Sequence, residues 1–447
     1  MQRDLTVGNP MKIIISFTAP IMAGNIFQQV YGMVDAMIVG KFVGTQALAA
    51  VGSVSTIYFL IFGSITGFTA GITVPTAQRF GAGDHKNMRR SVVSAMFLAL
   101  LCILTTTSIS MFFMDRLLTA MNTPADIFQD AYVYIMIICG GIFATVSYNT
   151  LSGIIRGLGN SRTPLVFLTI ATILNILLDL LFVIQFHMGV AGAGIATVLA
   201  QTVSAALCLW YIVCRMPELR LQEGDFCLEK HLLKMQAGIG LPMAFQYSIT
   251  ALGAIVVQSS LNMLGSLSVA AVTAAGKIEQ FANQVYVALG TTMATFGAQN
   301  KGAGKIKRIR EGFRAATILA AIYSVFIGLL IGFGGKYLTG LFVSEQVAEV
   351  TVLVDVYLKC AAIFYMTLAI VNIYRNGIQG MGYGLLPMLA GVAEFLGRTI
   401  TGIIAGRQKS YLIVCLSNPA AWTFASILLL VVYFRIMKKE EAVFDRS

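Results

Sequence analysis

Long apolar segments, bounded by charged residues or by glycine and proline clusters, recur along the whole chain. The first runs from Ile13 to Val39 between Lys12 and Lys41, and about 20 apolar residues suffice to span a bilayer. The pattern predicts six membrane helices before a polar stretch at 214–234 and six after it. The twelve predicted segments are 13–39, 45–76, 91–114, 131–155, 164–186, 190–213, 236–263, 267–298, 315–335, 352–374, 385–405 and 410–434.

The composition strengthens this interpretation. Hydrophobic residues make up 57% of the chain, charged residues make up 11%, and the mean hydropathy is +0.80. A soluble domain carries about 25% charged residues. We therefore predict an all-α polytopic membrane protein. The net charge of +11 comes from short basic runs between the apolar segments, which is typical of a topology signal and does not indicate a nucleic-acid partner.

The basic residues also predict an orientation. If all twelve segments cross the bilayer, 23 Lys and Arg residues fall on one side and 6 on the other, and Lys277 and Arg398 inside segments complete the 31. Because cytoplasmic loops carry the excess of Lys and Arg, we place both termini in the cytoplasm and the chain in the inner (plasma) membrane.

The two halves of the chain repeat each other. The run Ala77-Gln-Arg-Phe-Gly-Ala-Gly83 returns as Ala298-Gln-Asn-Lys-Gly-Ala-Gly304 at an offset of 221, and Pro20 returns as Pro242 at an offset of 222. Each half holds an even number of spans, so the halves enter the membrane from the same side as parallel repeats. This predicts two six-helix bundles, at 1–213 and 235–447, joined by a cytoplasmic linker at 214–234.

Apart from Asp355 and Lys359 near the outer end of the tenth segment, six charged residues interrupt the apolar segments, and a charge in the bilayer core costs at least about 2.5–3.5 kcal/mol on insertion scales. Glu394 and Arg398 are spaced i, i+4, so they can neutralise each other as a packed or a functional ion pair. Lys277 and Glu279 are two positions apart and point in different directions, which leaves proton or substrate handling and a gating or structural contact both open. The remaining two are the acids Asp35 and Asp179.

Asp35 and Asp179 form the stronger pair. They lie roughly 9 and 12 Å below the outer ends of the first and fifth segments, so a shared site is permitted. Asn175 is one turn before Asp179, while Thr197 and Tyr134 lie in the outer parts of their own segments. Carboxylates, an amide and hydroxyls are the ligands of a small hard cation, and paired acids would equally make a proton relay. The structural alternative is a polar cluster that only holds helices together.

At these positions the chain resembles the MATE (multidrug and toxic compound extrusion) family, and its DinF-like bacterial branch in particular. The resemblance covers about Pro10 to Lys439. It rests on Val34-Asp-Ala-Met-Ile-Val-Gly40, the two repeated loops Gln78-Arg-Phe-Gly-Ala-Gly83 and Gln299-Asn-Lys-Gly-Ala-Gly304, Arg156-Gly-Leu-Gly-Asn160 with Pro164, and Leu174-Asn-Ile-Leu-Leu-Asp179.

The resemblance implies a MATE fold of two parallel-related six-helix bundles that exports amphipathic, mostly cationic drugs or toxins in exchange for Na⁺ or H⁺ by alternating access. It places the cation or proton site at Asp35, Tyr134, Asn175, Asp179 and Thr197, with Na⁺ ligands at Asp35, Asn175, Asp179 and Thr197, and a hinge at Pro20. We assign the remaining polar candidates to substrate or secondary charged sites: Gln28, Asn149, Gln246, Lys277, Glu279, Glu394 and Arg398. The resemblance also shows a departure, because members of the NorM-type branch carry further acids in the seventh and tenth segments, whereas this chain has Gln246 and Thr250 in the seventh.

Two other classes compete with a drug antiporter. A flippase or exporter of a lipid-linked or other endogenous metabolite would favour a cationic cavity, whereas the segments hold four acids against two bases. A membrane enzyme would need a metal or nucleophile constellation, and His85, His187 and His231 are scattered in loops or at segment ends. We therefore expect a transporter and not an enzyme, without a cofactor, acting as a monomer in the lipid bilayer.

Overall fold

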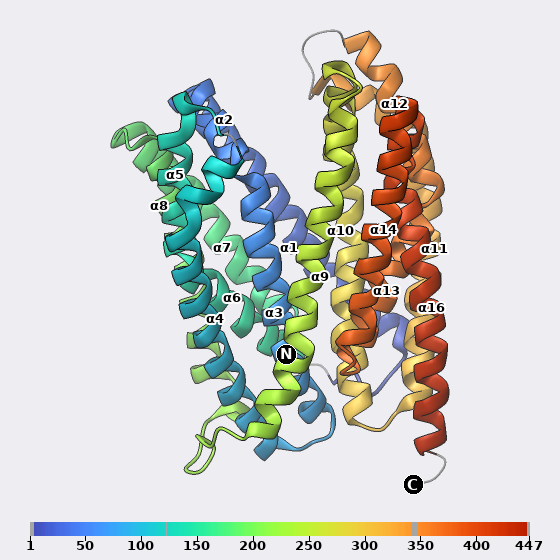
Figure 1. Ribbon diagram of the computed structural model, residues 1–447. Helices are drawn as coiled ribbons and strands as arrows, with labels where there is room; N and C mark the ends of the chain where they lie inside the picture. Colours follow the sequence, from blue (N-terminus) through green and yellow to red (C-terminus); the bar gives the residue numbers. More distant parts are fainter. Residues whose placement is uncertain (1–3, 122, 342–346, 445–447) are drawn as a thin grey trace. The chain divides into compact units, whose positions relative to one another are not determined.

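The computed structural model describes residues 4–121, 123–341 and 347–444, and within these ranges the chain is helical and contains no strand. Arg3 and Arg446, two of the basic residues in the topology count, lie outside the described residues. Figure 1 shows the helices running side by side as bundles.

Every predicted apolar segment is helical in the structure. Nine helices in the described part of the chain are long and apolar enough to cross a membrane, and up to eleven spans result if two bent helix pairs each count as one. The helix α10 (Ser266–Gly302) corresponds to the eighth predicted segment, 267–298. It is not among these eleven because Glu279, Asn283 and Gln284 interrupt its apolar residues. The chain is therefore a multi-pass membrane protein.

The contacts divide the chain into two compact units, which are described separately. Unit 1 comprises Ala23–Ala244 together with Asp4, and its core is formed by buried aliphatic residues from most of its helices. Its elements are the later part of α1 (Pro10–Ile38), η1 (Val39–Val43), α2 (Thr45–Ser53), α3 (Ser55–Gly81), α4 (His85–Ala120), α5 (Ala125–Gly140), α6 (Ile142–Gly157), α7 (Arg162–Asp179), η2 (Leu180–Gln185), α8 (Gly189–Arg215), η3 (Pro217–Leu219) and the start of α9 (Lys230–Asn262).

Unit 2 comprises Leu5–Met22 and Phe245–Ser447. Its largest core cluster contains several buried aromatic side chains, among them Tyr286, Tyr365 and Phe313. Its elements are the start of α1, the later part of α9, α10, α11 (Ile306–Gly334), η4 (Gly335–Leu341), α12 (Val347–Ile363), α13 (Tyr365–Gly380), α14 (Leu385–Gln408), α15 (Tyr411–Cys415) and α16 (Ser417–Phe444).

Two helices contribute to both units, so the structure divides the chain differently from bundles at 1–213 and 235–447. Helix α1 passes from unit 2 to unit 1 after Met22, and α9 passes from unit 1 to unit 2 after Ala244. Each crossing point follows a proline inside the helix by two residues, Pro20 in α1 and Pro242 in α9. The crossing points are 222 positions apart, which is the offset of the repeat.

The parts of α1 and α9 that precede the crossing points each pack against another helix of their unit. The two contacts occupy equivalent positions of the repeat but differ in chemistry. In unit 2, the hydroxyls of Thr18 and Thr292 are 2.8 Å apart, which joins α1 to α10. In unit 1, α9 crosses α3 so closely that a Cβ atom built on Gly71 would lie 2.5 Å from the Cα atom of Gly240. At the repeat offsets of 222 and 221, Gly240 corresponds to Thr18 and Thr292 to Gly71.

The predicted linker at 214–234 is held against unit 1. Arg89 Nε donates a hydrogen bond of 2.6 Å to Asp225 Oδ2, and Arg89 also bonds the side chain of Gln222 at 2.9 Å. The bond from Arg89 lowers the pKa of Asp225. Leu219 is buried among residues of the unit 1 core. The segment is therefore an ordered part of unit 1.

Candidate functional site

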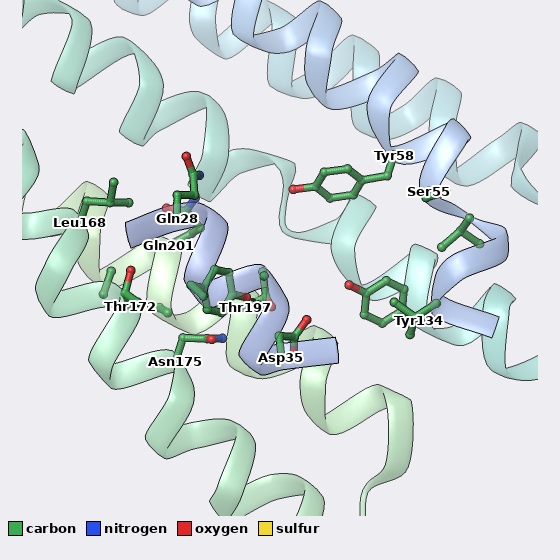
Figure 2. Close-up of a pocket in the computed structure, with 16 residues that line it drawn as sticks. Gln28, Asp35, Ser55, Tyr58, Tyr134, Leu168, Thr172, Asn175, Thr197 and Gln201 are labelled. Atoms are coloured by element: carbon green, nitrogen blue, oxygen red, sulfur yellow. Dashed lines mark hydrogen bonds between the residues drawn. The ribbon is translucent and has the colours of Figure 1, made fainter. Parts of the chain in front are cut away.

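Unit 1 contains a partly open cavity of about 400 Å³ that is lined by residues of helices α1, α2, α3, α5, α7 and α8 (Figure 2). The whole lining belongs to unit 1, because every lining residue lies between Gln28 and Gln201. Its polar and aromatic lining residues are Gln28, Tyr31, Asp35, Ser55, Tyr58, Tyr134, Thr172, Asn175, Thr197 and Gln201.

Helix α1 supplies one complete face of the cavity. Gln28, Tyr31, Gly32 and Asp35 are spaced by three or four positions, so their side chains follow one another along a single helix face. Helix α1 then gives way to the π-helical segment η1 at Val39, one turn beyond Asp35. Such segments are rare and are frequently found at functional sites.

Asp179 occupies the matching place on α7. It is the last residue of that helix, it is fully buried, and the π-helical segment η2 begins directly after it. The segments η1 and η2 contact each other. Both acids therefore lie shortly before the point where an α-helix changes to a wider π-helical turn.

The carboxyl groups of Asp35 and Asp179 are joined by a hydrogen bond. Two ionised carboxylates have no donor between them, so this hydrogen bond requires a proton on one of the two acids, whereas a bound cation would instead bridge two carboxylates. One oxygen of each, Oδ1, is buried and has no hydrogen-bond partner among the described residues. The pair therefore offers two oxygen atoms to an ion.

Asn175 connects the acids to the wall of the cavity. In the amide orientation that satisfies its neighbours, its Nδ2 donates to Asp179 Oδ2 at 3.2 Å and to the hydroxyl of Tyr31 at 3.3 Å, and its Oδ1 accepts from the backbone amide of Thr197 at 3.1 Å. The hydroxyls of Tyr31 and Thr197 are 3.0 Å apart. This network fixes α1, α7 and α8 to one another around the carboxyl pair.

Two tyrosines complete the cavity on the side of α3 and α5. Figure 2 shows the hydroxyls of Tyr58 and Tyr134 pointing toward the interior, where Asp35 and Thr197 lie. Aromatic rings with polar tips can contact a flat apolar molecule and also hold a water or an ion. Carboxylate, hydroxyl and amide oxygens are the ligands that a small hard cation prefers.

The structure brings the five predicted cation-site residues together. Four of them line the cavity: Asp35, Tyr134, Asn175 and Thr197. Asp179 is outside the lining and forms hydrogen bonds with Asp35 and Asn175. Five further polar or aromatic lining residues were not predicted from the sequence: Tyr31, Ser55, Tyr58, Thr172 and Gln201. Tyr31 could have been found, because it lies one turn before Asp35 on the same face of a predicted helix.

The remaining polar candidates lie in different places. Gln28 lines the cavity. Pro20 is in the part of α1 that belongs to unit 2, and Asn149 is in α6 outside the cavity lining. Gln246 is buried in unit 2, where its Oε1 accepts a hydrogen bond of 2.8 Å from Gln379 Nε2.

The charged residues of α10 point in different directions, as predicted. Lys277 is exposed, whereas Glu279 accepts a hydrogen bond of 2.9 Å from the hydroxyl of Tyr357 on α12. Asn418 on α16 donates to that hydroxyl at 3.4 Å and accepts from Arg398 Nε on α14 at 3.0 Å. Glu279 is therefore linked to the ion pair on α14 through two polar side chains.

The predicted pair of Glu394 and Arg398 is present, and Arg398 Nη1 lies 3.5 Å from Glu394 Oε2. The stronger partner of Glu394 is Arg375 on α13, whose Nη2 donates to Oε1. Arg375 follows the predicted segment 352–374 and is one of the 23 basic residues counted outside the membrane, whereas in the structure it lies within α13 with 13% of its side chain exposed. Glu394 is thus held between two arginines on two helices.

Replacing Arg375 by methionine is expected to lower the free energy of unfolding by roughly 3 kcal/mol or more, because a buried carboxylate loses its main partner. Adding Glu394→Gln should restore most of the loss, since the charge is then removed with its partner. Thermal unfolding in detergent can be followed by labelling of the buried thiol of Cys415. A single variant as stable as the parent chain would contradict the expectation.

Comparison with known proteins identifies the family. The sequence profile of the MatE family matches residues 20–181 and 242–404, one match in each half. The probable multidrug resistance protein YpnP of Bacillus subtilis strain 168 is 30% identical over 396 residues, covering 86% of each chain. An FAD transporter of Shewanella oneidensis is 22% identical over 373 residues, covering 82% of each chain.

The fold is also shared with solved structures. A MOP superfamily transporter from Pyrococcus furiosus superimposes with a TM-score of 0.92 at 21% identity, covering 98% of each chain. The chain therefore belongs to the MATE family of membrane transporters, which confirms the predicted family and the all-helical membrane fold.

Proposed function

We propose that this transporter is an antiporter that exports amphipathic, mostly cationic drugs or toxins in exchange for inward Na⁺ or H⁺. The observation that carries the proposal is the bonded pair of Asp35 and Asp179 beside a cavity inside an apolar bundle. Charged side chains at such depth are costly and mark ion pathways in membrane proteins. The pair carries one negative charge with a proton or a monovalent cation bound and two negative charges without one.

The position of α1 supports alternating access. Asp35 is on the part of α1 that belongs to unit 1, whereas Pro20 is on the part that belongs to unit 2. Proline removes a backbone hydrogen bond and kinks a helix. If a change of charge at Asp35 shifts the later part of α1, the helix would therefore bend near Pro20.

The cavity supports a cationic cargo. It holds the carboxylate of Asp35 with the rings of Tyr31, Tyr58 and Tyr134, and among the described residues no Lys or Arg lines it. Tyrosine faces attract a cation by roughly 0.5–2 kcal/mol each. Relatives such as YpnP are named as probable multidrug resistance proteins.

The test is ion movement in proteoliposomes that contain the purified chain. A lipophilic cationic dye added to one side should draw either Na⁺ or H⁺ from the opposite side to the side of addition, measured with a sodium tracer and with a trapped pH indicator. Movement of one ion identifies the coupling ion. If no dye from a panel of cations, and no anionic control compound, moves either ion, the antiporter proposal fails.

Tyr31→Phe is expected to weaken the apparent affinity for the coupling ion by roughly fivefold, because one buried hydrogen bond contributes about 1 kcal/mol. The hydroxyl that this substitution removes forms hydrogen bonds with Thr197 and Asn175. Tyr132→Phe on α5 is the matched control, since Tyr132 is outside the cavity lining. Equal affinities in the two variants would contradict a role of Tyr31 in the site.

We also propose that the termini and the segment before α9 face the cytoplasm of the cell. Cys214 and Cys227 are the exposed cysteines of the chain, and both lie in this segment. A membrane-impermeant maleimide should label them in inverted membrane vesicles and leave them unlabelled in intact cells. Labelling in intact cells would reverse the orientation.

A second candidate cargo is an endogenous metabolite. The observation in its favour is the relative named as an FAD transporter. The acids of the cavity disfavour a flavin nucleotide, whose phosphates are anionic. In the same proteoliposomes, coupled ion movement with FAD and none with cationic dyes would support this candidate over the first.

A further inference from the structure

A second pocket, of about 660 Å³, lies at the end of α7 and α8 in unit 1 and takes no part in the proposed ion site. The membrane span formed by α7 begins at Arg162, and the span formed by α8 ends at Arg215. Both arginines line the pocket. The pocket is therefore at the level where the apolar core of the bilayer gives way to lipid headgroups.

The charged groups of the pocket favour an anion. Arg162 and Arg215 are exposed, and neither forms an ion pair within the described part of the chain. Glu218 is the one acid in the lining. Two guanidinium groups presented together can bind a phosphate with several charge-assisted hydrogen bonds.

The inner wall of the pocket is rigid. Asn160 is buried, and its Nδ2 donates to the hydroxyl of Tyr211 at 3.0 Å and to Thr163 Oγ1 at 2.8 Å. Asn160 Oδ1 accepts from the backbone amide of Thr163 at 3.1 Å. The rings of Phe167 and Tyr211 pack edge to face. These contacts hold the start of α7 against the end of α8, so the pocket is formed before a ligand binds.

An apolar track continues from the pocket along α7. Val166 lines the pocket, and Val166, Ile170, Ile173 and Leu177 follow at helical spacing on one face, exposed by 53%, 44%, 56% and 58%. In a membrane helix such a face contacts acyl chains. Trp210 of α8 lines the pocket with half of its surface exposed, as tryptophans at the bilayer interface do.

We propose that this pocket binds an anionic glycerophospholipid of the surrounding bilayer, with the headgroup phosphate at Arg162 and Arg215 and the acyl chains along the exposed face of α7. A soluble phosphate would use the arginines alone, whereas the apolar track fits a lipid. With the orientation proposed above, the lipid belongs to the cytoplasmic leaflet. The inference concerns binding and is independent of the transported ion and cargo.

The chain contains its own probe for this site, because Trp210 and Trp422 are its two tryptophans and Trp422 is buried in unit 2. In a Trp422→Phe variant, all tryptophan fluorescence comes from Trp210. If that variant does not fold, the fluorescence of Trp210 can be obtained by subtracting the fluorescence of a Trp210→Phe variant from that of the parent chain. In vesicles that mix phosphatidylglycerol and phosphatidylcholine, brominated acyl chains on one lipid quench a tryptophan that they contact.

Brominated phosphatidylglycerol is expected to quench Trp210 more strongly than brominated phosphatidylcholine at equal fractions. Each arginine should contribute a preference of about fivefold. The preference should disappear in Arg162→Gln/Arg215→Gln and persist in Arg220→Gln, which removes a nearby positive charge outside the pocket lining.

Three outcomes would overturn the proposal. The first is equal quenching by the two lipids, and the second is a preference that the double variant retains or that Arg220→Gln lowers by the same amount. The third is loss of the preference on adding inorganic phosphate, which would assign the pocket to a soluble phosphate. Unchanged quenching in phosphate, together with loss in the double variant, supports a lipid site.

Discussion

Asp35→Asn is expected to abolish dye-driven ion movement while leaving the folded chain in the membrane. The amide has the shape of the carboxylate and can still hydrogen-bond Asp179, so the contacts among α1, α7 and α8 survive. It cannot release a proton or supply a negative charge to a cation. Loss of one partner from a buried charged pair costs about 2 kcal/mol or more, so ion affinity should fall by roughly 30-fold or more.

The measurement compares ion movement in proteoliposomes and drug resistance in cells that lack their own efflux pumps. Asp179→Asn should behave in the same way, since the two acids share one site. Asp130→Asn is the matched control, because Asp130 is an exposed acid on α5, one turn before Tyr134. Drug export by Asp35→Asn at the level of the parent chain would show that the carboxyl pair is structural.

Gly71→Ala is expected to destabilise unit 1 by roughly 1–3 kcal/mol, which is the usual cost of forcing extra volume into a packed core. The added Cβ atom would lie 2.5 Å from the Cα atom and 2.7 Å from the backbone nitrogen of Gly240. Backbone atoms cannot rotate away as a side chain can, so α3 and α9 would have to separate. Thr18→Ala removes one hydrogen bond at the equivalent contact in unit 2 and should cost about 0.6 kcal/mol.

Gly238→Ala is the control for this prediction. Gly238 lies two residues from Gly240 on α9, and a Cβ atom there meets no other atom within 4 Å. Alanine stabilises a helix relative to glycine, so this variant should be at least as stable as the parent chain. Thermal unfolding can be followed by labelling of the buried Cys139 and Cys208 in unit 1. Equal unfolding temperatures for the Gly71 and Gly238 variants would contradict a tight crossing.

The cost of an isolated charge in a membrane explains why the sequence could locate the ion site. Asp35 and Asp179 stand out in apolar segments, and the segment count places them at similar depths, which permits a shared site. Helical spacing extends the site to Asn175. The same argument does not reach Tyr58 or Gln201, because tyrosine and glutamine are common at helix surfaces and nothing in the pattern turns them toward the acids.

Other features depend on packing between distant segments. The pairing of Arg375 with Glu394 joins two helices whose relative rotation is not encoded in a hydropathy pattern. The π-helical turns after Asp35 and Asp179 change the direction of the following residues, and no residue type marks them. The shared helices α1 and α9 were not predicted either, since an unbroken apolar segment does not show that its two ends pack in different units.

These shared helices bear on how the chain arose. Each unit is completed by the opening turns of the helix that begins the other half, so neither half of the sequence carries all the parts of its own bundle. An ancestor of half this length could have built the same bundle only by exchanging its first helix between two copies. A duplication of such an ancestor would place that exchange within a single polypeptide, and the Gly-Gly and Thr-Thr crossings would then be two copies of one contact that now differ in sequence.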